Sequence, residues 1–155
     1  MPIRQLDDKS VPRSPFSDWL RTVGKKHWDS HLDGIRVYDI DWCVWKKEDD
    51  DFGDGPFMLF EEKQFYARPR YDQAFLMYKL DKILKADAYY KGFHLLQFEK
   101  NHPSNGDILL DEEYITYDDF ITFWQFGAPD KKYISWFDKL KEKDVHWKQH
   151  VHVPA

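Results

Sequence analysis

Two short stretches of the chain carry residues whose types and spacing suit metal-assisted hydrolysis of a phosphodiester. Asp39 and Asp41 lie two positions apart in an apolar run, and Glu61 and Lys63 lie two positions apart in a later one. Because side chains alternate across a β-strand, the members of each pair should share one face of their strand. If the two strands pair in register, three carboxylates and one ammonium group converge.

Carboxylates in this arrangement predict a site for Mg²⁺ or Mn²⁺. Both ions prefer hard oxygen ligands, and Mg²⁺ keeps several water molecules that phosphate oxygens can replace. The metal would stabilise charge on the phosphate and help to generate a hydroxide. The amine of Lys63 would orient or deprotonate the attacking water.

The elements that must position these residues are predicted from the pattern of apolar and turn-forming residues. Residues 35–45 are rich in β-branched and aromatic side chains, which favours a strand in the interior of a sheet. Residues 49–56 hold two Gly, one Pro and four Asp, so the chain must turn there. A second strand should run from residue 57 to about residue 65, which makes a long-looped antiparallel hairpin with the first.

The rest of the chain is predicted to alternate helices with two further strands. Ser14 and Pro15 have the residue types of a helix start, and that helix should end near Gly24. Thr116 and Asp119 resemble a capping box that begins another helix. The remaining predicted elements are helices over 72–85 and 132–143 and strands over 92–98 and 108–115.

Length and composition predict one folded domain, and the predicted mixture of helices and strands makes it an α/β domain. The chain has 155 residues, of which 42% are hydrophobic and 18% aromatic, unlike a disordered chain. We predict a flexible lead-in over residues 1–13, the domain over 14–145 and a polar tail over 146–155. The single cysteine, Cys43, lies in an apolar run and is predicted to be buried. No apolar run is long enough to span a bilayer and no signal-peptide pattern is present, so we expect a cytoplasmic protein without a membrane partner.

In order and spacing, these residues resemble the PD-(D/E)XK nuclease superfamily. The matching parts are an acid strand over 35–42, an apolar strand ending in Glu-x-Lys at 61–63, and a helix carrying Gln73 and Tyr78. Some branches of that superfamily have a glutamine and a tyrosine on the corresponding helix, so a supporting role is implied for these two residues. The resemblance covers about residues 16–98. It implies a restriction-endonuclease-like fold, with a central mixed β-sheet flanked by helices.

The resemblance also implies roles for individual residues. Asp41 and Glu61 would bind the metal, the backbone carbonyl of Glu62 would complete the shell, and Lys63 would be the catalytic lysine. Asp39 is an alternative first acid, because it should share a face with Asp41.

A second alternative concerns the frame of the Glu-x-Lys strand. Because alternate residues face opposite ways, Glu62 and Gln64 could face the site in place of the Glu-x-Lys pair. The residues alone leave this choice open.

Two functions are compatible with these observations. The first is a magnesium- or manganese-dependent nuclease that hydrolyses DNA phosphodiester bonds. Because so small a chain has little surface for target recognition, it would act as a homo-oligomer or as a subunit of a larger nucleic-acid-processing complex. The alternative is a non-catalytic binding protein, of phage or mobile-element type, that retains a nuclease-like fold.

Charge and geometry bear on the choice between these functions. The net charge of -5 favours the binding protein, since nucleic-acid binding usually needs a basic face. Only the nuclease requires Asp41, Glu61 and Lys63 to converge. The positive surface of a nuclease would come from Lys25, Lys26, Arg68, Arg70, Lys79 and Lys82.

Overall fold

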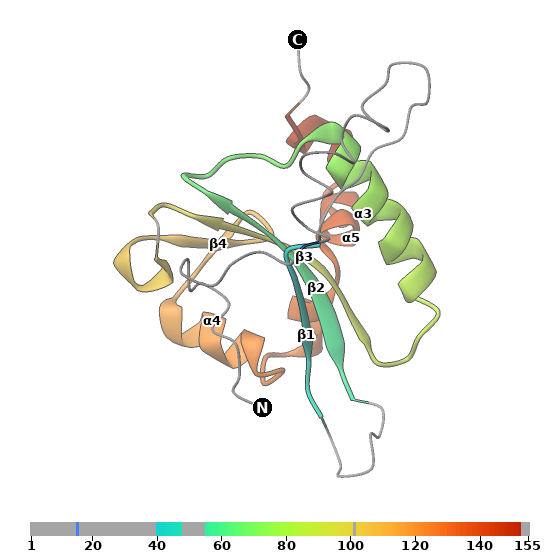
Figure 1. Ribbon diagram of the computed structural model, residues 1–155, viewed down its shortest axis with the longest axis horizontal. Helices are drawn as coiled ribbons and strands as arrows, with labels where there is room; N and C mark the ends of the chain where they lie inside the picture. The colour runs from blue at the N-terminus through green and yellow to red at the C-terminus, as the bar shows by residue number, and fades with distance from the viewer. Residues whose placement is uncertain (1–14, 16–39, 48–54, 101, 153–155) are drawn as a thin grey trace. The chain divides into compact units, whose positions relative to one another are not determined.

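The computed structural model describes residues 15, 40–47, 55–100 and 102–152. The chain divides into two compact units, Met1–Tyr38 and Asp39–Ala155, and the elements below belong to the second. Within it, five strands form one mixed sheet in the order β1-β2-β3-β4-β5, accompanied by helices (Figure 1). The predicted α/β class is therefore confirmed. The helix predicted from residue 14 to 24, apart from Pro15, lies outside the described residues.

The predicted hairpin is present and antiparallel. β1 (Trp42–Trp45) pairs with β2 (Phe57–Gln64), and the register places Trp42 opposite Phe60. The backbone N–H of Lys46 donates to the carbonyl of Pro56 at 2.9 Å, which extends the pairing towards the loop. Residues 35–39 of the predicted first strand lie outside the described part of the chain.

A helical crossover joins β2 to a parallel neighbour. α3 (Tyr71–Leu84) leads to β3 (Tyr90–Phe98), so the helix predicted over 72–85 and the strand over 92–98 are both confirmed. β3 is buried from residue 92 to 98, as expected of a parallel strand with helices on both faces. The register sets Glu61 beside Leu95 and Lys63 beside Gln97.

The single edge strand predicted over 108–115 is wrong in one respect, because it is two strands. β4 (Ile108–Leu110) and β5 (Glu113–Ile115) form an antiparallel hairpin around Asp111 and Glu112. These two residues have φ of 51° and 67°, the left-handed conformation of a tight hairpin turn. Neither is Gly or Asn, so the sequence carries little signal for this turn.

Two helices follow the sheet. α4 (Tyr117–Trp124) begins as predicted, with Thr116 Oγ1 accepting a hydrogen bond from the backbone N–H of Asp119 at 3.1 Å. The helix predicted over 132–143 is interrupted. A 3₁₀ turn, η3 (Asp130–Tyr133), precedes α5 (Trp136–Glu142), and Ser135 stands between them in an extended conformation.

The sheet separates two cores. On one face, Leu59, Phe93 and Leu95 pack with α3 and α5, and on the other, Phe60 and Leu96 pack with α4 (Figure 1). None of the helices in the described ranges combines the length and the apolar character that a membrane crossing requires.

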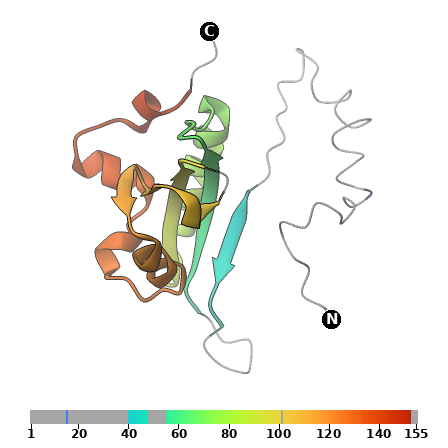
Figure 2. The same cartoon turned by 90° about the vertical axis from the view of Figure 1, so that its left-hand side faces the viewer.

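The prediction that Cys43 is buried is wrong, because its side chain is exposed. Cys43 lies opposite Leu59 and so belongs to the face that α3 and α5 cover. These helices pack over β3, however, and β1 lies at the edge of the described sheet (Figure 2).

The segment predicted to be a polar tail differs from that prediction over residues 147–151. Trp147 and Val151 are only 5% and 6% exposed and belong to the core beneath α3. The Trp147 ring stacks on Tyr71 at 5.7 Å between centroids and meets Phe137 edge-on at 5.8 Å. These two apolar side chains anchor the segment together with the backbone hydrogen bonds that His152 makes to Pro69 and Tyr71.

Replacing this anchor should destabilise the domain. We expect Trp147→Ala to lower the free energy of unfolding by about 3 kcal/mol, because it empties a large site in a packed aromatic cluster. Urea denaturation followed by circular dichroism measures this. Gln149→Ala, at an exposed position in the same segment, is the matched control and should change little. Equal stabilities for the two variants would contradict the core role of Trp147.

Candidate active site

The site forms where the β1–β2 hairpin meets the first turn of α3. Asp41 directly precedes β1, and continuation of the strand register brings it beside Glu61 on β2. The Oδ2 atom of Asp41 accepts a hydrogen bond of 2.9 Å from the backbone N–H of Glu62. This hydrogen bond attaches the Asp41 side chain to the backbone of β2, and so fixes the position of the Asp41 carboxylate.

Glu61 is the centre of a compact group of three side chains. Its Oε1 atom accepts a hydrogen bond from Gln73 Nε2 at 2.7 Å and lies 3.1 Å from Lys63 Nζ. Lys63 Nζ in turn donates to Gln73 Oε1 at 3.3 Å. Residues from β2 and α3 therefore hold the carboxylate, the amine and the amide in one fixed arrangement.

The second oxygen of Glu61 is buried without a partner. Glu61 is 2% exposed, and its Oε2 atom has no hydrogen-bond partner among the described residues. Burial, and next the nearby Asp41 carboxylate, raise the pKa of Glu61 to about 7, although the Lys63 amine partly opposes them. A buried carboxylate of this kind is costly unless a cation or proton compensates it.

The oxygen donors fit a hard divalent cation. The two carboxylates come from Asp41 and Glu61, and Glu61 Oε2 is free to act as a ligand. In a β-strand, the N–H and C=O groups of one residue point towards the same neighbouring strand. The Glu62 N–H donates to Asp41, so the Glu62 carbonyl also points towards Asp41. The described residues contain no group of three His, Cys, Asp or Glu side chains that could hold a metal. Backbone, water and phosphate oxygens would complete the shell, as Mg²⁺ commonly allows.

The frame of the Glu-x-Lys strand is decided by the sheet. Glu61 and Lys63 contact Gln73 of α3, whereas alternation along β2 sends the Glu62 side chain to the other face of the sheet. Desolvation by burial, together with the Asp41 charge, raises the pKa of Glu62. Glu61 and Lys63, and not Glu62, therefore share the face of β2 on which Gln73 lies.

The remaining predicted residues have different outcomes. Gln73 joins the Glu61 group directly. Tyr78 does not: its ring packs edge-on against Phe137 at 5.3 Å and lies 5.6 Å from Trp147, within the core. Asp39 lies outside the described residues.

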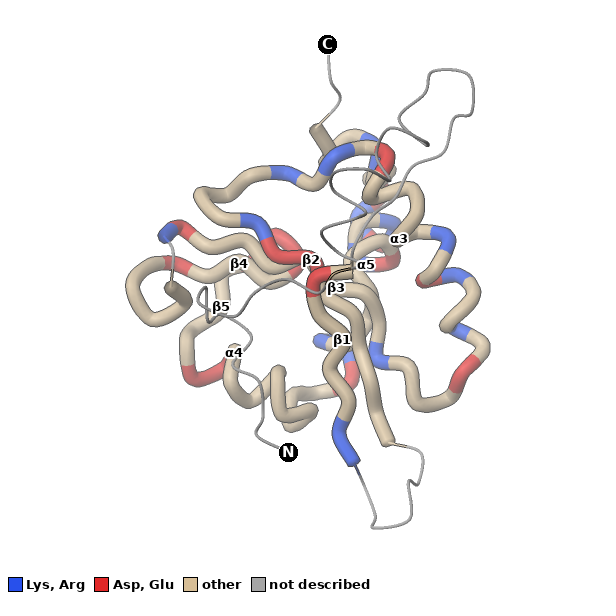
Figure 3. Tube along the Cα trace, viewed as in Figure 1, with Lys and Arg blue, Asp and Glu red and all other residues tan. Residues whose placement is uncertain are grey.

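Basic residues flank the site. Arg68 and Arg70 follow β2 and are exposed, and Lys79 and Lys82 are exposed on α3. Figure 3 shows acidic and basic segments following one another along β2, and further basic segments on the connection to α3 and along that helix. Lys25 and Lys26 lie outside the described residues.

Gln97 is a residue of this region that sequence reasoning missed. It is buried on β3 beside Lys63, and its Nε2 atom donates to the carbonyls of Tyr66 and Ala67 at 3.3 and 3.0 Å. A lone glutamine within an apolar strand was the available signal.

A second buried polar cluster, around Asp111, has a structural role. Asp111 Oδ2 lies 2.8 Å from His94 Nδ1 and 2.7 Å from Lys139 Nζ, and its Oδ1 accepts from the Leu95 N–H. Burial acts to raise the pKa of Asp111, but His94 and Lys139 outweigh it, so the pKa is lowered. The cluster ties β3 to α5.

The buried Glu61 should make the metal-free protein less stable at high pH. Its folded pKa of about 7 exceeds the ordinary 4.5, so the folded state binds the proton more tightly than the unfolded state does. Stability should therefore fall as pH rises from about 4.5 to 7. Glu61→Gln lacks this penalty and should exceed wild type at pH 8 by on the order of 2 kcal/mol, with little difference at pH 4.

Thermal denaturation in a chelator, and again with Mg²⁺ or Mn²⁺, measures both effects. Added metal should raise the melting temperature of wild type but not of Glu61→Gln. Glu142→Gln, at an exposed position of α5, is the matched control. If the stabilities of wild type and Glu61→Gln depended on pH in the same way, the pKa of Glu61 would not be raised in the folded protein.

Comparison with known proteins does not assign this chain to a family. No protein-family description, no curated protein and no solved structure matches the chain. Function is therefore inferred from the side chains of the site.

Proposed function

We propose that this protein is a metal-dependent nuclease that hydrolyses phosphodiester bonds in DNA, with a restriction-endonuclease-like fold of the PD-(D/E)XK type. The observation that carries the proposal is the meeting of Asp41, Glu61 and Lys63 at one place. The hairpin, the crossover helix with Gln73 and the parallel strand β3 also agree with a mixed sheet flanked by helices.

Each residue of the group has a role in this reaction. Asp41, Glu61 and the Glu62 carbonyl would hold Mg²⁺ or Mn²⁺, which when bound would supply Lewis-acid stabilisation of the phosphate. The Lys63 amine, held between Glu61 and Gln73, would orient the attacking water. Its side chain is 23% exposed, so solvent and substrate can reach it.

The cost of the site argues against a purely structural or binding role. Burying Glu61 with one oxygen unpaired, beside a second acid, lowers stability. Proteins retain such arrangements where function requires them. A binding module of the same fold has no need for them.

The net charge of -5 is compatible with DNA binding if the positive charge is gathered near the site. Arg68, Arg70, Lys79 and Lys82 are exposed on the connection to α3 and on that helix. We expect the protein to act in the cytoplasm as a homo-oligomer or as a subunit of a larger nucleic-acid-processing complex, because one chain offers little recognition surface.

Cleavage assays test the proposal directly. The full chain with Mg²⁺ or Mn²⁺ should nick or degrade DNA among single-stranded, double-stranded and branched substrates. Lys63→Ala should lower the rate by about 100-fold or more, because it removes water positioning and charge stabilisation. Asp41→Asn should have a similar effect by weakening the metal site.

Two controls make the result specific. Lys141→Ala, an exposed lysine of α5, should cleave as wild type does, and melting temperatures should show that all variants fold. Wild type that is inert on every substrate would favour the non-catalytic binding protein. Equal activity in wild type, Lys63→Ala and Asp41→Asn would assign the cleavage to other residues.

A further inference from the structure

The turn that follows β2 exposes a phenylalanine in an unfavourable backbone conformation. Phe65 and Tyr66 have φ of 55° and 56°, in the left-handed region that large side chains rarely adopt. The Phe65 side chain is 66% exposed, so burial of its ring does not offset this strain. Backbone strain at an exposed aromatic residue is a reason to look for a ligand.

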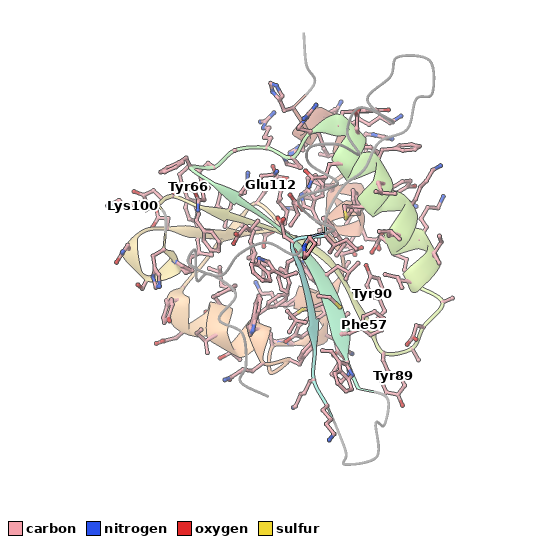
Figure 4. The ribbon with its side chains drawn as sticks, in the orientation of Figure 1. Phe57, Tyr66, Tyr89, Tyr90, Lys100 and Glu112 are labelled. Atoms are coloured by element: carbon pink, nitrogen blue, oxygen red, sulfur yellow. The ribbon has the colours of Figure 1, made fainter. Side chains whose placement is uncertain are left out.

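The turn is held rigidly by the neighbouring strand. The N–H of Tyr66 donates to the Phe98 carbonyl at 3.2 Å, and the N–H of Ala67 donates to the Gln64 carbonyl at 3.1 Å. Gln97 Nε2 donates to the carbonyls of both Tyr66 and Ala67. Figure 4 shows Tyr66 where the ribbon of β2 ends.

Gln97 makes these two bonds at a cost. Its Oε1 atom is buried and has no hydrogen-bond partner among the described residues. An apolar side chain would avoid that cost but would leave the two carbonyls without these bonds. The side chain is therefore suited to holding the turn in shape.

The turn lies within one nucleotide's reach of the candidate site. Phe65 directly follows Gln64, the last residue of β2, so at most about 7 Å separates its Cα atom from that of Lys63. The exposed Arg68 and Arg70 follow it and carry the charge that a phosphate backbone requires. The backbone of the turn is therefore close enough to Lys63 for a nucleotide to span the two residues.

We propose that Phe65 stacks on an unpaired base next to the scissile phosphate, and that the substrate class is DNA with single-stranded bases at the cleavage position. This inference rests on the proposed nuclease function of the same site. In an intact duplex, neighbouring bases already cover both faces of each base, whereas a single strand, a flap or a frayed end leaves one free. The ring supplies an apolar face for stacking, and the arginines supply charge.

Binding to oligonucleotides tests the inference without relying on cleavage. In a Lys63→Ala background with Mg²⁺, fluorescence anisotropy should show at least about tenfold tighter binding to a single strand than to a duplex of the same length. Adding Phe65→Ala should remove about tenfold of the single-strand affinity, and Phe65→Trp should retain it. A 2-aminopurine placed beside the bound phosphate should be quenched only when an aromatic residue is present at position 65.

The control is a second exposed aromatic residue. Tyr114 on β5 is 74% exposed, and Tyr114→Ala should leave single-strand affinity unchanged. Equal affinity for single strand and duplex, or no loss with Phe65→Ala, would overturn the role of Phe65. Absence of cleavage by wild type refutes the nuclease function whatever the binding result, and loss of the binding difference refutes the role of Phe65 whatever the cleavage result.

Discussion

The register of the β1–β2 hairpin is the constraint on which the candidate site depends. With Trp42 opposite Phe60, the apolar side chains Trp42, Val44 and Phe60 all face the core beneath α4. The same register sends Asp41 and Glu61 to the opposite face, beside each other. A slip of one residue would turn Trp42 and Val44 out of that core, so the packing of one face of the sheet fixes which side chains meet on the other. This is why a four-residue edge strand can position a carboxylate reliably.

Burial gives the site its chemical character. Gln73 and Lys63 occupy one oxygen of Glu61, and the other is left buried and unpaired. Burial disfavours the charged form of Glu61, and the negative charge of Asp41 disfavours it further, so the pKa of Glu61 rises to about 7. By contrast, Asp111 is equally buried but fully paired, and its pKa is lowered. These two buried acids thus differ in their partners, and of the two it is Glu61, with one oxygen unpaired, that lies beside the Asp41 carboxylate and the half-buried Lys63.

The parallel pairing of β2 with β3 fixes the position of residues next to the site as well. It sets Gln97 beside Lys63, where its amide reaches the backbone of the turn that follows β2. That turn carries Phe65 in a strained conformation and leads through two exposed arginines into α3. One strand therefore supplies the buried acid and the amine, and then leads directly into the exposed turn at Phe65. The helix that follows supplies the glutamine that orients them.

The sequence by itself determined the features that depend on local patterns. Alternation and the turn-rich loop predicted the hairpin, apolar periodicity predicted α3, and Thr116 predicted the start of α4, because each depends on neighbours in the chain. Tertiary structure decided that Cys43 is exposed and that Trp147 and Val151 are buried. It also placed Tyr78 in the core and Gln97 at the turn. In addition, it determined that Glu61 and Lys63 share the face of β2 on which Gln73 lies. These outcomes depend on which elements cover each face of the sheet, and such long-range packing leaves no periodic trace in a single sequence.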